Sequence, residues 1–421
     1  MGSLSLYRSV PLVLAACASA PSTTASSTTA PSTATATVAY VGGTVIPSPD
    51  AAPIADGVVL TAGDRITAVG SRATTPIPSG ARVVDCHGAT VVAGLWNSHL
   101  HFTQPAFLDP GHAAPQALEA AVAELTSRWG FTHVVDLGSM PGVVETVRAR
   151  IARGELRGPA IQIAGGPFVT VGGQPIYVKE VTLPVIATPA EGKAAAEQMF
   201  AIGADHIKLM TASVVASPPP PVMPVEVVRA VTDVAHDRHA LVFAHPTFLG
   251  GVLAARDGGV DVLAHTAPAS GPWTPALAAS LVAAHMALIP TLALWRQEIE
   301  AENPAVAERY ETDAISQVRA FVAAGGTLVF GTDAGYRPEL DPTPEHKLLA
   351  RAGLTFAQRL AMLTTAPAAV LGVAHAGQIA PGFEADLAIL DGDPTADPAA
   401  FARVRLTVHD GAVIYARPTS K

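Results

Sequence analysis

The chain has 421 residues, and 49% of them are hydrophobic, so it can bury a large core and is not disordered throughout. Charged residues make up only 14%, and the formal net charge of −9 argues against a nucleic-acid-binding surface, which needs a basic excess. No window reaches about 18 consecutive apolar residues, so the sequence predicts no membrane-spanning helix. Two cysteines, Cys17 and Cys86, are too few for a disulfide framework.

The N-terminus has the features of an export signal. An arginine precedes an apolar stretch over residues 10–16, and residues 14–17, Leu-Ala-Ala-Cys, resemble a bacterial lipobox, whose cysteine is lipidated after cleavage. Residues 18–37 contain only Ala, Ser, Thr and Pro, a composition typical of a flexible tether. We therefore predict a lipoprotein-type signal over residues 1–17 and an exported bacterial cell-envelope protein, held to the membrane only by a lipid on Cys17. The alternative is an unprocessed N-terminus with a chance cysteine.

Short segments of β-strand character, separated by Gly, Pro and Asp, occur at both ends of the remaining chain. They lie at residues 38–41, 57–60, 65–69 and 82–85 near the start, and at residues 385–390, 404–408 and 412–415 near the end. We expect these strands to form one split β-sandwich from residues 38–92 and 376–421.

Between the two ends, apolar segments alternate with stretches of helical pattern, such as residues 115–129, 189–202 and 225–238. Short, nearly continuous apolar strands are typical of a parallel sheet that is buried on both faces. Eight such strands are predicted, at residues 90–93, 132–136, 161–164, 206–210, 241–245, 260–265, 287–291 and 327–332. The expected fold class is therefore α/β, with a (β/α)8 TIM barrel over residues 93–375 and an active site at the C-terminal ends of its strands.

Residues that can bind a metal recur at these strand ends. His99 and His101 follow the first strand, and residues i and i+2 of an extended segment point the same way, so both imidazoles can face one ion. The others lie in or after later strands: Lys208, His245, His265 and Asp333. Each has a plain structural alternative, such as a core histidine, a lysine at the barrel rim or an aspartate that holds a turn. Their joint placement favours a metal centre, because imidazole and carboxylate suit zinc and similar ions.

The segments around these residues resemble motifs of the amidohydrolase superfamily, and within it of the imidazolonepropionase-like and Xaa-Pro dipeptidase-like branch. The resemblance covers residues 38–415 and rests on segments at 94–101, 206–209, 243–246, 263–266, 331–335 and 381–390. It implies a metal-dependent hydrolase that cleaves an amide or peptide C–N bond of a small molecule, such as a dipeptide, an N-acyl amino acid or a cyclic amide. Family members are often oligomeric, so the resemblance also suggests a homo-oligomer.

The resemblance further implies a centre of two divalent metal ions, expected to be zinc, with a hydroxide between them that attacks the carbonyl. The implied ligands are His99, His101 and Asp333 for one ion and His245 and His265 for the other. Lys208 would bridge both ions after carboxylation by carbon dioxide, because a free ammonium cannot bind a metal whereas a carbamate can. Asp333 would also be the catalytic proton shuttle between the attacking hydroxide and the leaving nitrogen.

Two alternative functions stay open. Asn97 precedes the His-x-His pair where many binuclear members have Asp, and Asn is common there in mononuclear zinc deaminases. Such deaminases usually carry a glutamate just after the fifth-strand histidine, whereas Pro246 follows His245 here, and they do not need Lys208. The second alternative is a non-catalytic binding lipoprotein that kept the fold, although such a protein would have no use for Lys208 and Asp333 together.

The loops after the barrel strands are expected to shape the substrate pocket. Trp295, Tyr336 and Arg337 lie in two of these loops and are candidate substrate contacts, with ordinary surface positions as the alternative. The identity of the amide substrate does not follow from the sequence.

The lipobox-like segment leads to a testable prediction. Replacing Cys17 with Ser should release the protein from the membrane fraction without changing its hydrolytic activity, because serine cannot carry the lipid. Cell fractionation followed by immunoblotting measures the shift, with Cys86→Ser as the matched control. A Cys17→Ser variant that stays with the membranes as the parent does would contradict the prediction.

Overall fold

The computed structural model describes residues 36–179, 181–216 and 219–418. The predicted signal at residues 1–17, including Cys17, lies outside the described residues, as does the predicted tether up to residue 35. Thr37, which the sequence assigned to the tether, is the first residue of a β-strand. Every helix in the described part of the chain is too short or too polar to cross a membrane.

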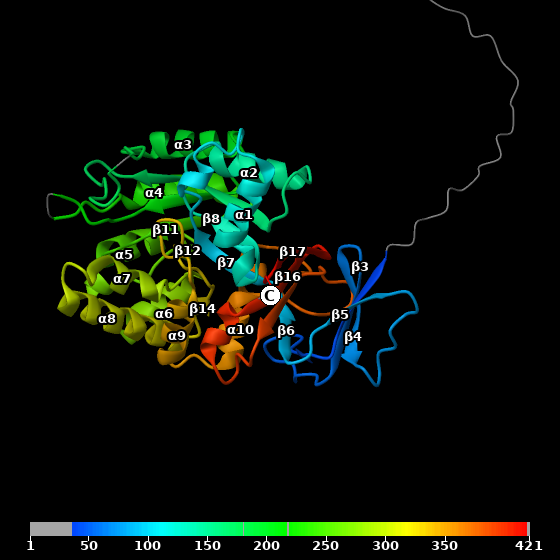
Figure 1. Ribbon diagram of the computed structural model, residues 1–421. Coiled ribbons are helices and arrows are strands. Elements are labelled where there is room, and N and C mark those ends of the chain that lie inside the picture. The colour runs from blue at the N-terminus through cyan, green and yellow to red at the C-terminus, as the bar shows by residue number, and fades with distance from the viewer. Residues whose placement is uncertain (1–35, 180, 217–218, 419–421) are drawn as a thin grey trace, which may run out of the picture. The chain divides into compact units, whose positions relative to one another are not determined.

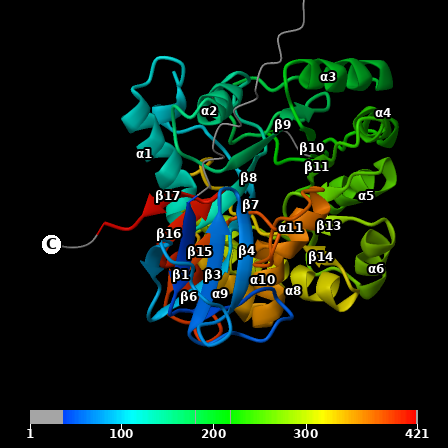
Figure 2. The ribbon, with the colours of Figure 1, turned by 90° about the vertical axis from the view of Figure 1, so that its right-hand side faces the viewer.

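Strands from both ends of the chain form two sheets (Figures 1 and 2). The first has the order β4-β3-β1-β5 and the second the order β17-β16-β15-β6-β2. Side chains of both sheets, including Tyr40, Val59, Val91 and Ile389, pack into one apolar core. The predicted split β-sandwich is therefore confirmed. Its strands are β1 (Thr37–Val41), β2 (Thr44–Val45), β3 (Gly57–Ala62), β4 (Arg65–Ser71), β5 (Arg82–Asp85), β6 (Ala89–Ala93), β15 (Leu387–Asp391), β16 (Val404–His409) and β17 (Ala412–Ala416).

Eight parallel strands between these segments form the predicted barrel, and each pairs with the next one along the chain. Backbone hydrogen bonds close the ring between the first strand and the segment after the last one. Ser98 N–H donates to the Phe330 carbonyl at 2.7 Å, and Asp333 N–H donates to the His99 carbonyl at 2.8 Å. The strands are β7 (Leu95–Leu100), β8 (Phe131–Asp136), β9 (Ala160–Val169), β10 (His206–Met210), β11 (Val242–His245), β12 (Val262–Leu263), β13 (Ala287–Leu288) and β14 (Thr327–Leu328).

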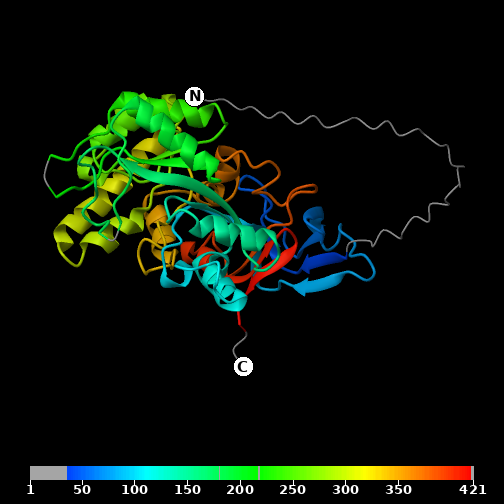
Figure 3. The ribbon, with the colours of Figure 1, turned by 90° about the horizontal axis from the view of Figure 1, so that it is seen from above.

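Helices connect successive strands, and α3 and α4 pack against β9, β10 and β11 on the outside of the ring (Figures 1 and 3). The predicted helix at 115–129 is shorter than expected, because a 3-10 turn over Ser127–Trp129 and the left-handed Gly130 end it. The helices are α1 (Pro115–Leu125), α2 (Val143–Ala152), α3 (Pro189–Ala201), α4 (Val225–His236), α5 (Leu249–Gly258), α6 (Pro275–Ala283), α7 (Leu292–Ile299), α8 (Pro304–Ala323), α9 (Thr343–Arg351), α10 (Phe356–Leu363) and α11 (Thr365–Val370).

The segment predicted as the first barrel strand, residues 90–93, belongs to the sandwich instead. It is part of β6, which pairs antiparallel with β15, and the first barrel strand is β7. The chain changes sheets at Gly94. Gly94 N–H donates to the Asp386 carbonyl in the sandwich, and Leu95 N–H donates to the Gly130 carbonyl in the barrel. Both apolar segments suit a buried strand, so the sequence pattern could not assign them to different sheets.

The last three barrel strands are shorter than predicted. The segments at 260–265, 287–291 and 327–332 contribute only two paired residues each to the ladder. The apolar run continues beyond the paired residues, because the interior cluster includes Ala264, Ile289 and Val329 as well. His265 and Asp333 consequently lie in the loops just past the strand ends, where backbone geometry is less regular.

The change of sheets at Gly94 predicts a local steric limit. A Cβ at this position would overlap the side chain of Thr132, so Gly94→Ala should destabilise the protein by about 1–3 kcal/mol. Urea denaturation measures the change. Gly111→Ala is the control, because its Cβ would have only Asp109 Oδ1 nearby, at 3.9 Å. Adding Thr132→Ala to Gly94→Ala should recover part of the lost stability, and an unchanged midpoint for Gly94→Ala alone would contradict the steric argument.

Candidate metal centre

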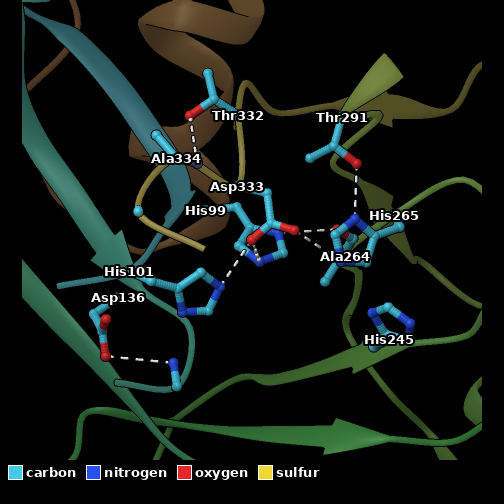
Figure 4. A network of polar contacts seen from close by, with 12 residues as sticks. His99, His101, Asp136, His245, Ala264, His265, Thr291, Thr332, Asp333 and Ala334 are labelled. Atoms are coloured by element: carbon cyan, nitrogen blue, oxygen red, sulfur yellow. Dashed lines mark hydrogen bonds and ion pairs between the residues drawn. The ribbon is translucent and has the colours of Figure 1, made fainter. Parts of the chain in front are cut away.

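His99, His101 and Asp333 meet where the first and last barrel strands join (Figure 4). His99 belongs to β7 and His101 follows its end, while Asp333 lies in the segment after β14. Asp333 Oδ1 is 2.8 Å from His101 Nε2 and 3.2 Å from His99 Nε2. Gly335 permits the close approach, because it has a φ of 95° and a Cβ there would overlap the His101 carbonyl. Three potential ligands therefore meet at one buried point.

The three other predicted residues surround this group. His265 Nε2 is 3.8 Å from Asp333 Oδ2, and the His265 ring lies 4.7 Å from that of His99 and 4.6 Å from that of His245. Lys208 lies in the middle of β10 with 3% of its surface exposed, next to the strand that ends at His245. The structure therefore brings all six predicted residues together at one end of the barrel.

Hydrogen bonds on the far side of two rings fix which nitrogen faces the site. His99 Nδ1 donates to the Ala264 carbonyl at 3.0 Å. His265 Nδ1 donates to Thr291 Oγ1 at 2.7 Å, because that hydroxyl gives its own proton to the Pro290 carbonyl at 2.9 Å (Figure 4). In both rings the proton lies on Nδ1, so Nε2 presents its lone pair toward the centre of the site.

Burial determines the charge of these groups. It lowers the pKa of His99 to about 4, that of His245 to about 3, and that of His265 well below its usual value. These rings are therefore neutral at pH 7. Burial opposes ionisation of Asp333, but His99 and His101 outweigh this effect and hold the pKa of the carboxyl well below its usual range. The site thus combines neutral imidazoles with one buried carboxylate.

The donor atoms fit a divalent cation. His99 Nε2 lies 3.2 Å from a carboxylate oxygen of Asp333, close to the roughly 3.3 Å that separates two ligands of one tetrahedral zinc ion. Asp333 Oδ1 is buried and makes no hydrogen bond of good geometry within the described ranges, although His101 Nε2 lies 2.8 Å away. A cation between these atoms would give Asp333 Oδ1 a partner, and imidazole with carboxylate is a ligand set that zinc accepts. These three residues could therefore hold one metal ion.

A model of the amidohydrolase family matches residues 90–414. The chain belongs to the amidohydrolase family. It is therefore a hydrolase that acts on carbon–nitrogen bonds. No curated protein sequence matches this amidohydrolase.

Solved structures share its fold over nearly the whole chain. A candidate prolidase from Bifidobacterium longum is 25% identical, with a TM-score of 0.77 over 92% of this chain and 96% of that one. A Xaa-Pro dipeptidase with bound methionine in its active site is 22% identical, with a TM-score of 0.77 over 90% of this chain and 99% of that one. An ochratoxinase from A. niger is 18% identical, with a TM-score of 0.75 and coverage of 90% and 96%. The last two likenesses show that the fold is shared.

Lys208 of this amidohydrolase is an unusual buried lysine. Burial lowers its pKa to about 8, against the attraction of Asp333 and Asp136. Asp136 ends β8 and was not predicted as a site residue. Its carboxylate accepts the backbone N–H groups of Gly138 and Ser139, at 3.3 and 3.0 Å, and also the Ser139 hydroxyl. This carboxylate is an additional buried acid of the site.

Tyr177 and Glu298 were also missed by the sequence interpretation. The Tyr177 hydroxyl lies 3.1 Å from His245 Nε2 and 3.0 Å from Ser213 Oγ, and its ring is 5.7 Å from that of Tyr336. Burial, together with the neighbouring Asp333, raises the pKa of Glu298, although a hydrogen bond from Tyr336 lowers it. Tyr177 comes from the loop after β9 and Glu298 from helix α7, and neither segment carries a motif, so the available signal was their position after barrel strands.

The three candidate substrate contacts have different surroundings. Tyr336 lies against Tyr177, and Arg337 is 3.4 Å from Glu339 with 28% of its side chain exposed. Trp295 is only 5% exposed and packs behind His265, with ring centroids 6.0 Å apart. Its indole N–H donates to Thr266 Oγ1 at 2.8 Å. A bound substrate could reach the exposed part of Arg337, whereas Trp295 supports the position of His265.

The hydrogen bond that orients His265 generates a prediction. Thr291→Val removes the acceptor of the Nδ1 proton, so zinc affinity should fall about 10–100-fold while the fold persists. Titration of the metal-free protein with zinc against a competing chelator measures this change, with circular dichroism as the check on folding. Thr312→Val is the control, because its hydroxyl bonds the Glu308 carbonyl on exposed helix surface. Equal zinc affinity for Thr291→Val and the parent would contradict the assigned tautomer.

Proposed function

We propose that this amidohydrolase cleaves the amide bond of a small molecule, most simply a dipeptide, and uses two divalent metal ions. The observation that carries the proposal is the convergence of neutral buried imidazoles, the ionised Asp333 and the buried Lys208 at the C-terminal end of the barrel. The names of the related structures, a candidate prolidase and a Xaa-Pro dipeptidase, support the dipeptide.

We propose that the ligands divide between the two zinc ions as the family resemblance implies. His99, His101 and Asp333 would hold one ion, His245 and His265 would hold the second, and Lys208 would bridge them. At pH 7 a lysine of pKa about 8 is neutral in roughly one molecule in ten. The neutral amine can add its lone pair to carbon dioxide and lose a proton, which gives an anionic carbamate. This reaction would convert Lys208 from a cation into a metal ligand.

Bound ions would supply an activated water and polarise the scissile carbonyl. Asp333 would accept a proton on Oδ1 and deliver it to the leaving nitrogen, because its low pKa keeps the carboxylate ionised before each turnover. The Tyr177 hydroxyl would hold the His245 ring in position, since it lies 3.1 Å from Nε2 of that ring. The exposed guanidinium of Arg337 would attract a substrate carboxylate.

The position of Asn97 weakens the case for a mononuclear deaminase. Its side-chain amide donates to Thr332 Oγ1 at 2.8 Å, and its carbonyl oxygen accepts the His99 N–H at 3.2 Å and the Thr332 N–H at 3.3 Å. Asn97 therefore joins β7 to the segment that carries Asp333, and this structural task explains the residue without a change of reaction. Buried Lys208, which a deaminase does not need, supports the binuclear hydrolase.

Lys208 gives the decisive variant. Lys208→Ala should be folded but nearly inactive, with lower occupancy of at least one metal, because two cations close together repel strongly unless an anion bridges them. Added formate or acetate should restore part of the activity, since a short carboxylate can occupy the vacated position. Metal analysis and dipeptide hydrolysis measure both effects, and Lys193→Ala on the exposed surface of α3 is the control. Parental turnover and metal content in Lys208→Ala would reject the binuclear proposal.

A panel of substrates separates the remaining functions. The zinc- or manganese-loaded protein is assayed with dipeptides, N-acyl amino acids, cyclic amides and amino-substituted heterocycles. We expect hydrolysis of the dipeptides, with two amino acids released from each one. Release of ammonia from the heterocycles alone would identify a deaminase, and the absence of any turnover would favour a binding protein.

A further inference from the structure

A second group of metal-ligating side chains lies between the barrel and the sandwich. His133 is near the start of β8, Asp386 directly precedes β15, and His409 is the last residue of β16, which runs next to β8. His133 and Asp386 are 7% and 3% exposed, and the His409 side chain is 14% exposed. Asp136 at the opposite end of β8 belongs to the site described above, so this group marks the N-terminal end of the barrel.

The distances within this group are those of metal ligands. His409 Nδ1 is 2.9 Å from Asp386 Oδ2, and His133 Nδ1 is 3.4 Å from the same oxygen. One ligand atom from each of the three residues lies within 4.8 Å of the others. Ligands about 2.0–2.1 Å from a tetrahedral zinc ion are separated by roughly 3.3 Å, so small adjustments would suffice for all three to bind one ion.

The far nitrogens of both rings also face carboxylates. Glu384 Oε2 lies 3.5 Å from His133 Nε2, and Asp410 Oδ2 lies 3.7 Å from His409 Nε2. This arrangement, a carboxylate behind each imidazole, is the one that orients histidines at zinc sites. Glu384 Oε2 is buried and lacks a hydrogen-bond partner in the described part of the chain. Its approach to His133 Nε2 is therefore the polar contact by which we explain its position.

An ion pair alone explains only part of the group. Asp386 raises the pKa of His409, and a charged His409 would balance Asp386. This pair does not explain the position of His133. Its ring stacks on Trp96 with centroids 4.1 Å apart, and its Nδ1 faces Asp386, which is already paired with His409. Arg65 is a nearby cation for Glu384 and Asp410, and burial raises the pKa of Glu384 to about 7, so Glu384 carries only part of a negative charge at pH 7.

We propose that His133, Asp386 and His409 form a structural site for one zinc ion, separate from the catalytic centre, with Glu384 and Asp410 orienting the two rings. Two imidazoles and a carboxylate are the ligands that zinc prefers, and a fourth position remains for water or for the Thr132 hydroxyl, which lies 3.2 Å from His133 Nδ1. His133 comes from β8, Asp386 from the residue before β15 and His409 from β16, so the ion connects the sandwich to the base of the barrel.

Counting zinc per chain tests the site. The full-length protein is equilibrated with zinc and analysed by mass spectrometry, together with two variants designed to keep the local packing. His133→Phe keeps the stacking on Trp96 but has no ligand atom, and His409→Lys keeps a cation beside Asp386 but cannot bind zinc. Each variant should lose one equivalent of zinc. The control, His236→Gln, removes a histidine that pairs with Asp261 on the surface and should lose none.

A second measurement separates this site from the catalytic one. In a His101→Ala/His265→Ala background, which removes one ligand of each proposed catalytic ion, added zinc should still raise the melting temperature, because zinc at the junction binds only the folded protein. Adding His133→Phe should abolish that shift. Parental zinc content in both junction variants would overturn the proposal and leave an ion pair only. The absence of a zinc-dependent shift in the His101→Ala/His265→Ala background would overturn it as well. If His133→Phe fails to fold by circular dichroism, His409→Lys replaces it in both measurements.

Discussion

The hydrogen bonds that close the barrel are the constraint on which the catalytic site depends. His99 and Asp333 lie at opposite ends of the barrel sequence. Asp333 N–H nevertheless donates to the His99 carbonyl, so their side chains project from neighbouring, hydrogen-bonded backbone segments. In an open sheet the first and last strands would lie at opposite edges, and the two groups could not meet. Asn97 strengthens the joint through its bonds to Thr332. Closure of the ring and assembly of the site are therefore the same event.

The apolar interior beneath the site sets the chemistry of what lies above it. Val135, Phe243, Val262 and Ile289 fill the barrel with hydrocarbon, so the histidines next to them cannot keep a hydration shell and remain neutral. The same environment makes the ammonium form of Lys208 unfavourable. A fold stabilised by burial of apolar strands thus also prepares neutral nitrogen ligands, and the charge of Lys208 lowers the pKa of His245 further.

Much of this organisation could be predicted, because it follows from the alternation of apolar strands with helices and from the polar residues that end those strands. Seven of the eight barrel strands, the split sandwich and the convergence of His99, Lys208, His245 and Asp333 follow from apolar segments and the residues that end them. The assignment of residues 90–93 was wrong, since two consecutive buried strands look alike in sequence. The contact of Tyr177 with His245 depends on the path of a long loop, and no local pattern records such a path.

The change of sheets at Gly94 also affects how the chain reaches its native state during synthesis. Strand β6 emerges from the ribosome early, but its partner β15 comes from the far end of the chain, and the Thr90 hydroxyl donates to the Gly392 carbonyl across a separation of 302 residues. Until that partner arrives, β6 has an unpaired edge directly attached to the first barrel strand. A nascent or truncated chain would thus expose this unpaired strand edge, to which other chains can bind.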